Sequence, residues 1–106
     1  MEENTESLLE IVYRYFTREG LSVDFNVPVK SEDGKKQNLD LVVTNSVGDK
    51  TGILVVNWDR SIGVNVIRKL NRIMQGKNNL KKGLLVGGSF SEHSRKFAKD
   101  YNIELL

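Results

Sequence analysis

The spacing of hydrophobic residues changes several times along the chain, and each change marks a different expected element. Over residues 5–18 the apolar positions recur every three or four residues, which predicts a helix with one apolar face. These positions are Leu8, Leu9, Val12, Tyr13 and Phe16. Asn4 or Thr5 is expected to cap the helix, and Gly20 is expected to end it.

Three stretches after this helix have the pattern of β-strands, and we expect them to form an antiparallel meander. They are residues 22–29, 39–44 and 52–58. In the first stretch, Val23, Phe25 and Val27 alternate with polar residues and are expected on one face. Pro28 ends this strand or marks an edge of the sheet. The third stretch is apolar almost throughout, which predicts a strand that is buried on both faces.

The rest of the chain alternates between helical and strand spacing, which predicts parallel strands joined by crossover helices. A helical stripe covers residues 64–74, with Gly76 as its expected end. A strand is expected at residues 83–86, a helix from Ser89 or Ser91 onward, and a last strand at residues 103–106. The expected fold is one α/β domain spanning residues 1–106, with the element order αβββαβαβ and a mixed central sheet flanked by helices.

Composition excludes several classes of function. The 106 residues include no cysteine and a single histidine, His93, so thiolate chemistry, cysteine zinc sites and two-histidine catalysis are ruled out. No apolar run approaches the roughly 20 residues that a membrane-spanning helix needs. The N-terminus is acidic and lacks the basic start of a secretory signal. We therefore expect a cytoplasmic protein that makes no membrane contact.

Charge is distributed unevenly, although the formal net charge is only +2. Residues 60–82 contain Lys and Arg residues but no acid. They are Arg60, Arg68, Lys69, Arg72, Lys77, Lys81 and Lys82. We interpret this set as a candidate surface for nucleic-acid phosphates, and the alternative is an ordinary solvated helix face. Trp58 beside Arg60 forms either an aromatic-plus-cation surface or a buried end of a strand.

Several short motifs occur in an order that resembles the PD-(D/E)XK nucleases, the restriction-endonuclease-like superfamily, and most closely its Mrr-like branch. A strand with an aspartate at residues 39–44 precedes a glycine turn and an apolar strand at residues 53–58. Ile-Gly-Val at 62–64, an apolar strand up to 86, Ser-Phe-Ser at 89–91, Lys-Phe-Ala at 96–98 and Ile-Glu-Leu at 103–105 follow in the family's order. The likeness covers nearly the whole chain.

The resemblance implies a metal-dependent nuclease site, but two of its three residues do not match. In the family, an aspartate on the second strand and an acidic or amide residue on the third hold a hard divalent cation, and a lysine two positions further assists the attacking water. Asp40 matches the aspartate, and Glu10 on the first helix matches an acidic position that many members use. The other two positions fall on Val55 and Asn57. We therefore expect no metal, no cofactor and no catalytic residue, with Glu10, Asp40 and Asn57 as vestiges of the site.

Each of these residues also has an ordinary structural interpretation. Asp40 suits a hydrogen-bonded acid at the start of a strand, Glu10 a solvated helix residue, and Asn57 a strand-end residue bonded to a loop. Asp59 is the nearest candidate for a displaced ligand, which would restore Mg²⁺ binding and cleavage.

Three functions remain open because a fold does not determine function. The first is a catalytically inactive nuclease-fold module that binds nucleic acid, in particular DNA, or a DNA-repair or replication protein. The second is an active metal-dependent DNA endonuclease with a displaced ligand. The third is a protein–protein adaptor that uses the fold as a scaffold. The resemblance also suggests a homodimer, because nucleases of this fold often dimerise.

Overall fold

A five-stranded mixed sheet, with the strand order β1-β2-β3-β4-β5, forms the centre of the computed structural model, which describes residues 7–57 and 61–106. The elements are α1 (Leu8–Arg18), β1 (Ser22–Lys30), β2 (Lys36–Thr44), β3 (Lys50–Val56), α2 (Val64–Gln75), β4 (Leu80–Gly87), α3 (Glu92–Asp100) and β5 (Ile103–Leu105). The predicted order αβββαβαβ is confirmed. The first three strands pair antiparallel, and β3, β4 and β5 pair in parallel, as expected.

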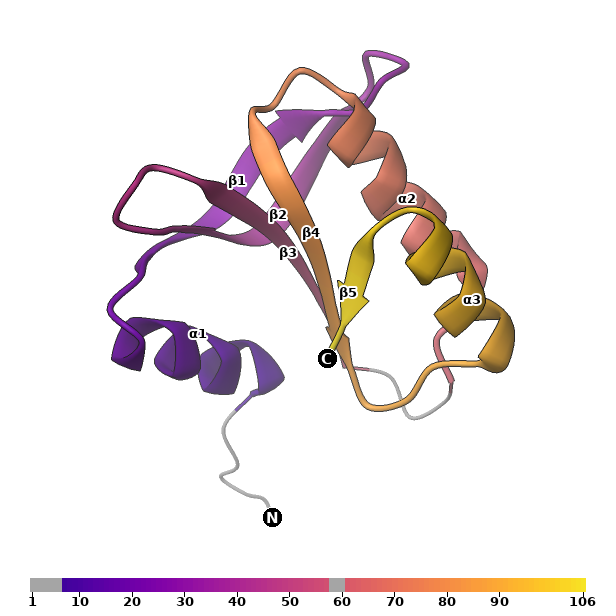
Figure 1. Cartoon of the computed structure of the whole chain (residues 1–106), viewed down its shortest axis with the longest axis horizontal. Helices are drawn as coiled ribbons and strands as arrows, with labels where there is room; N and C mark the ends of the chain where they lie inside the picture. The colour runs from indigo at the N-terminus through magenta and orange to yellow at the C-terminus, as the bar shows by residue number, and fades with distance from the viewer. Residues whose placement is uncertain (1–6, 58–60) are drawn as a thin grey trace.

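The helices form two layers on opposite faces of the sheet. Figure 1 shows α1 on one side, with α2 and α3 side by side on the other. The core is accordingly divided into two clusters. The α1-side cluster contains Val12, Leu41, Val43, Ile53, Leu84 and Val86, and the larger cluster beneath α2 and α3 includes Val42, Leu54, Ile67, Leu70, Ile73 and Leu85. The neighbours Ile53 and Leu54 belong to different clusters, which confirms that β3 is buried on both faces.

Alternate residues of β1 and β2 do not all stay on one face of the sheet. The expectation of one continuous apolar face on β1 is therefore wrong. Val23 packs against the α1-side cluster, whereas Val27 packs against the opposite cluster. Asn26 lies between them with φ 49°, a left-handed conformation that interrupts the alternation of side chains. Phe25, the remaining member of the expected face, is half exposed.

Helix α1 begins later than the sequence pattern predicted. Ser7 is its N-cap: the Ser7 hydroxyl accepts a hydrogen bond from the Glu10 N–H at 3.2 Å, and the Glu10 carboxylate accepts one from the Ser7 N–H at 3.4 Å. This reciprocal pair is a capping box. The expected caps, Asn4 and Thr5, lie outside the described residues. Gly20 follows the helix with φ +82°, a conformation that favours glycine and agrees with the predicted stop.

Gly76 ends α2 as predicted, but for a steric reason. Its φ is −77°, which any residue can adopt. A Cβ atom at this position would lie 2.2 Å from the backbone carbonyl oxygen of Lys30, so only glycine lets the end of α2 approach the hairpin between β1 and β2 this closely. The third helix starts after Ser91, one of the two predicted caps, whose hydroxyl accepts a hydrogen bond from the Ser94 N–H.

No helix in the described part of the chain is long and apolar enough to cross a membrane.

Candidate functional site

Strands β2 and β3 separate partway along their length, and we call the point of separation the fork of the sheet. The antiparallel ladder between these strands runs from Thr44 opposite Lys50 to Leu41 opposite Ile53 and continues no further. Beyond this point β2 pairs only with β1, and β3 pairs only with β4. A position at which two paired strands separate exposes backbone groups to other partners.

Asp40 lies at this fork, immediately beyond the last residue pair. Its carboxylate accepts a hydrogen bond from the backbone N–H of Val55 at 2.7 Å, and the side chain is half buried. The carboxylate therefore provides the acceptor that a β2 carbonyl would provide if the ladder continued. This contact agrees with the structural interpretation of Asp40, and it engages one of the two carboxylate oxygens.

Glu10 lies in the first turn of α1, where its carboxylate takes part in the capping box. Its Oε1 atom is 3.1 Å from the Ser7 hydroxyl and 3.4 Å from the Ser7 N–H. The side chain is exposed, and a negative charge in the first turn of a helix is favourable. Helix capping therefore accounts for Glu10 without a metal ion.

The two positions on the third strand differ in their surroundings. Val55 packs against the α1-side cluster, so its side chain belongs to the core rather than to an ion-binding cleft. Asn57 follows the last residue of β3 and is exposed. Within the described residues its amide makes no hydrogen bond, and the expected contact with a loop is not seen there. An exposed amide without a cation next to it offers little to a phosphate.

Metal-binding groups are sparse in this region. Residues 7–57 and 61–106 contain no cluster of three or more His, Cys, Asp or Glu side chains that could hold an ion. Asp59, the proposed displaced ligand, lies outside the described residues, as do Trp58 and Arg60. The described donors fit a hard cation poorly, because such an ion takes several oxygen ligands and no cluster of acidic side chains surrounds Asp40 among these residues.

The basic residues of α2 form one exposed surface. Arg68, Lys69 and Arg72 are exposed, whereas Ile67, Leu70 and Ile73 of the same helix are fully buried against the sheet. The helix contains no acidic residue in its first turn. These three cations therefore face away from the sheet, as the helical spacing predicted, on the layer opposite α1.

Two of the three lysines after α2, Lys81 and Lys82, have contacts away from this surface. Lys77 is exposed beyond the end of the helix. Lys81 forms an ion pair with Asp49 at 3.1 Å. Lys82 borders a cavity that Phe16 and Glu104 also line, on the α1 side of the sheet. The run of residues 60–82 is free of acids in sequence but not in space, and the basic set divides between two faces.

The segment at residues 87–89, Gly-Gly-Ser, precedes α3, and close packing explains its first glycine. A Cβ atom on Gly87 would lie 2.1 Å from the Cδ1 atom of Ile62. The Gly87 N–H already donates to the carbonyl oxygen of Leu106 at 3.1 Å, and the Ser89 carbonyl accepts from Ile62 at 3.0 Å. Much of this segment's hydrogen-bonding capacity is thus used inside the fold.

A groove between α2 and α3 brings Arg68 together with residues that the sequence pattern did not single out for binding. Val64, Arg68, Ser91, His93, Lys96, Phe97 and Asp100 line it. The Arg68 guanidinium lies 5.4 Å from the centre of the Phe97 ring, which is a cation–π distance. Phe97 is half buried. The spacing of Phe97 and Tyr101, one helical turn apart, is the sequence signal that could have identified the pair of aromatic rings beside this groove.

Comparisons with known proteins agree with this architecture. The family model Mrr_cat, described as a restriction endonuclease, matches residues 2–106. A search of curated proteins found no similar sequence. The solved structure of AF1548, a protein of unknown function, is 20% identical over 92% of this chain and 54% of that chain, with a TM-score of 0.80.

Two further solved structures have lower TM-scores. A repair endonuclease from Pyrococcus abyssi is 16% identical over 99% of this chain and 48% of its own, with a TM-score of 0.64. EndoMS in complex with double-stranded DNA is 15% identical over 98% of this chain and 47% of its own, with a TM-score of 0.56. The chain thus spans about half the length of these relatives. At such identities the likeness establishes the restriction-endonuclease-like fold.

Proposed function

The chain belongs to the Mrr_cat family of restriction endonucleases, and from that premise we propose that it is a nuclease-fold module that binds nucleic acid without cutting it. The expected lack of cleavage rests on one observation. At the position where the family places a second metal ligand, Val55 packs its side chain against the α1-side cluster, and its N–H donates to one carboxylate oxygen of Asp40. A branched alkyl group supplies no electron pair to a cation.

Nucleic acid is the ligand that the charges favour. Arg68, Lys69 and Arg72 lie on one exposed face, and no ion pair involves them among the described residues. Cations that are not paired with carboxylates are available to phosphates, and their contacts release counterions from the nucleic acid. We propose DNA in particular, because EndoMS, which shares the fold, is in complex with double-stranded DNA.

Binding would be measured by fluorescence anisotropy with duplex, single-stranded and branched DNA at low and moderate salt. Replacing Arg68, Lys69 and Arg72 together with Ala should weaken binding to every sequence and flatten the salt dependence by roughly two to three units of slope, about one for each lost phosphate contact. Exposed helix positions tolerate Ala, so the fold should survive.

A matched control removes three cations from another surface. Lys30, Lys35 and Lys36, all exposed in the hairpin between β1 and β2, would be changed together to Ala. This variant has the same net charge as the α2 variant, so a general charge effect would weaken both equally. If the unmodified protein binds none of the DNAs, the proposal fails and the adaptor function takes its place.

A further inference from the structure

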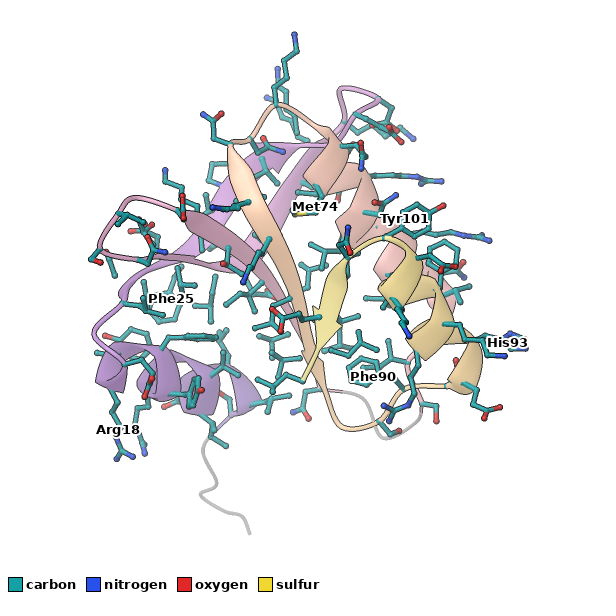
Figure 2. All side chains as sticks on the ribbon, viewed as in Figure 1. Arg18, Phe25, Met74, Phe90, His93 and Tyr101 are labelled. Atoms are coloured by element: carbon teal, nitrogen blue, oxygen red, sulfur yellow. The ribbon has the colours of Figure 1, made fainter. Side chains whose placement is uncertain are left out.

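The groove between α2 and α3 is lined by Phe97 and by cations, and the exposed ring of Tyr101 packs against Phe97 beside it. The groove has a volume of about 570 Å³. Arg68 lies over the Phe97 ring, and the centre of the Phe97 ring is 4.7 Å from that of Tyr101 at an angle of 39°. Tyr101 is 45% exposed. Figure 2 shows Tyr101 and His93 on the outer side of the α2–α3 layer, where a ligand from solvent can reach them.

The charge of this layer matches a polyanion. Helices α2 and α3 contain six Lys or Arg residues but only two acids, so this layer is more positive than the whole chain, whose formal net charge is +2. Asp100 is the acid that lines the groove. Within residues 7–57 and 61–106 no carboxylate lies within 4.0 Å of Arg68 or Lys96. Both cations can therefore contact a ligand.

We propose that this groove binds a single-stranded polynucleotide, with a base stacked against Tyr101 beside the groove and adjacent phosphates on Arg68 and Lys96 within it. The inference rests on the proposed function, and it assigns the form of nucleic acid and the face that receives it. Bases in a duplex stack on each other, whereas bases of a single strand are free to stack on an exposed aromatic ring. An aromatic surface beside unpaired cations suits that ligand better than a duplex, which needs only charge.

This site lies on the side of the sheet opposite α1, whose first turn holds Glu10. A strand held in the groove would therefore contact a helix layer different from the one that carries Glu10. Binding on this face does not require Asp40 or a metal ion.

The chain offers a matched control for the stacking residue. Tyr15 on α1 is 55% exposed, and the centre of its ring lies 5.1 Å from that of Phe16, so it is also an exposed ring beside a second aromatic ring. It is on the opposite layer. Tyr101→Leu and Tyr15→Leu each remove one exposed ring while keeping an apolar side chain. Urea unfolding of both variants would verify that each remains folded.

The test uses two 20-nucleotide single strands, one of oligo-dT and one of abasic sites with the same phosphates, and a duplex of equal length. Tyr101→Leu should weaken binding of oligo-dT by about 5- to 150-fold, the range for the loss of one base–aromatic stack. It should leave binding of the abasic strand nearly unchanged, and Tyr15→Leu should affect neither. Arg68→Ala should weaken binding of both single strands, because it removes a phosphate contact.

Several results would overturn the inference. Tyr101→Leu could change neither strand, weaken both equally, or act no differently from Tyr15→Leu. Tighter binding of the duplex than of oligo-dT, with no effect of Tyr101→Leu, would leave the proposed function intact and reject the groove as a single-strand site. Competition by poly-glutamate as effective as by oligo-dT would identify an acidic protein segment as the ligand instead. Repeating the titration with oligo-U distinguishes RNA from DNA, and tight binding of either supports the site.

Discussion

Removing the carboxylate of Asp40 tests whether this residue holds the fold together at the fork of the sheet. In Asp40→Ala the backbone N–H of Val55 loses the acceptor that lies 2.7 Å away. The ladder between β2 and β3 has already ended at Leu41 and Ile53, so the described strands offer no carbonyl in its place. The donor would remain half buried and unsatisfied.

The expected cost follows from that single donor. An unsatisfied buried polar group lowers the free energy of unfolding by about 1–3 kcal/mol. For this half-buried donor we expect a loss of about 2 kcal/mol. With a urea dependence of about 2 kcal/mol per molar, the unfolding midpoint should fall by about 1 M. Asp40→Asn keeps an acceptor oxygen and loses only the charge, so its midpoint should lie between those of the unmodified protein and Asp40→Ala.

Urea unfolding followed by circular dichroism measures these midpoints, and Asp24→Ala is the control. Asp24 lies on β1, is exposed, and makes no side-chain hydrogen bond to any described residue. Its replacement should change stability by less than about 0.5 kcal/mol. An Asp40→Ala midpoint that equals or exceeds that of the unmodified protein would refute the reasoning. A carboxylate retained for catalysis rather than for folding often lowers stability, so its removal would raise the midpoint.

Two further predictions concern contacts that the sequence alone does not show. Gly76→Ala should cost about 1–3 kcal/mol because a Cβ atom would lie 2.2 Å from the Lys30 carbonyl oxygen, whereas Gly63→Ala, with nothing within 4 Å of its Cβ, should cost much less in the same thermal unfolding experiment. Equal losses would contradict the close approach. Ser94→Ala should cost about 1–2 kcal/mol, because the fully buried hydroxyl donates to the Ile62 carbonyl at 2.7 Å. An unchanged melting temperature for this variant would show that the hydrogen bond contributes nothing.

The order of elements could be predicted because hydrophobic spacing reports local structure directly. Contacts between residues far apart in the sequence could not be predicted in this way. The change of face at Asn26 arises from one positive φ, and the sequence contains no glycine at that position to suggest it. The pairing of Lys81 with Asp49 joins residues 32 apart, so the basic run was predicted to be more uniform than it is.

The candidate site was predicted only in part, because it also depends on contacts between residues far apart in the sequence. The motif order located Asp40, Val55 and Asn57 on the second and third strands, and the structure adds that Asp40 binds the backbone of Val55 across the fork. Arg68 was identified from helical spacing, but its contact with Phe97 depends on how α2 packs against α3. Such packing between crossover helices is set by tertiary structure, which one sequence does not reveal.

The central claim is that this chain holds nucleic acid without cleaving it. The most direct measurement incubates the protein with end-labelled single-stranded and duplex DNA in Mg²⁺ or Mn²⁺, and follows binding and strand length in the same samples. We expect bound DNA that remains at full length in both ions. Shortened strands that depend on the metal ion and disappear in Asp40→Ala would contradict it and would establish an active endonuclease.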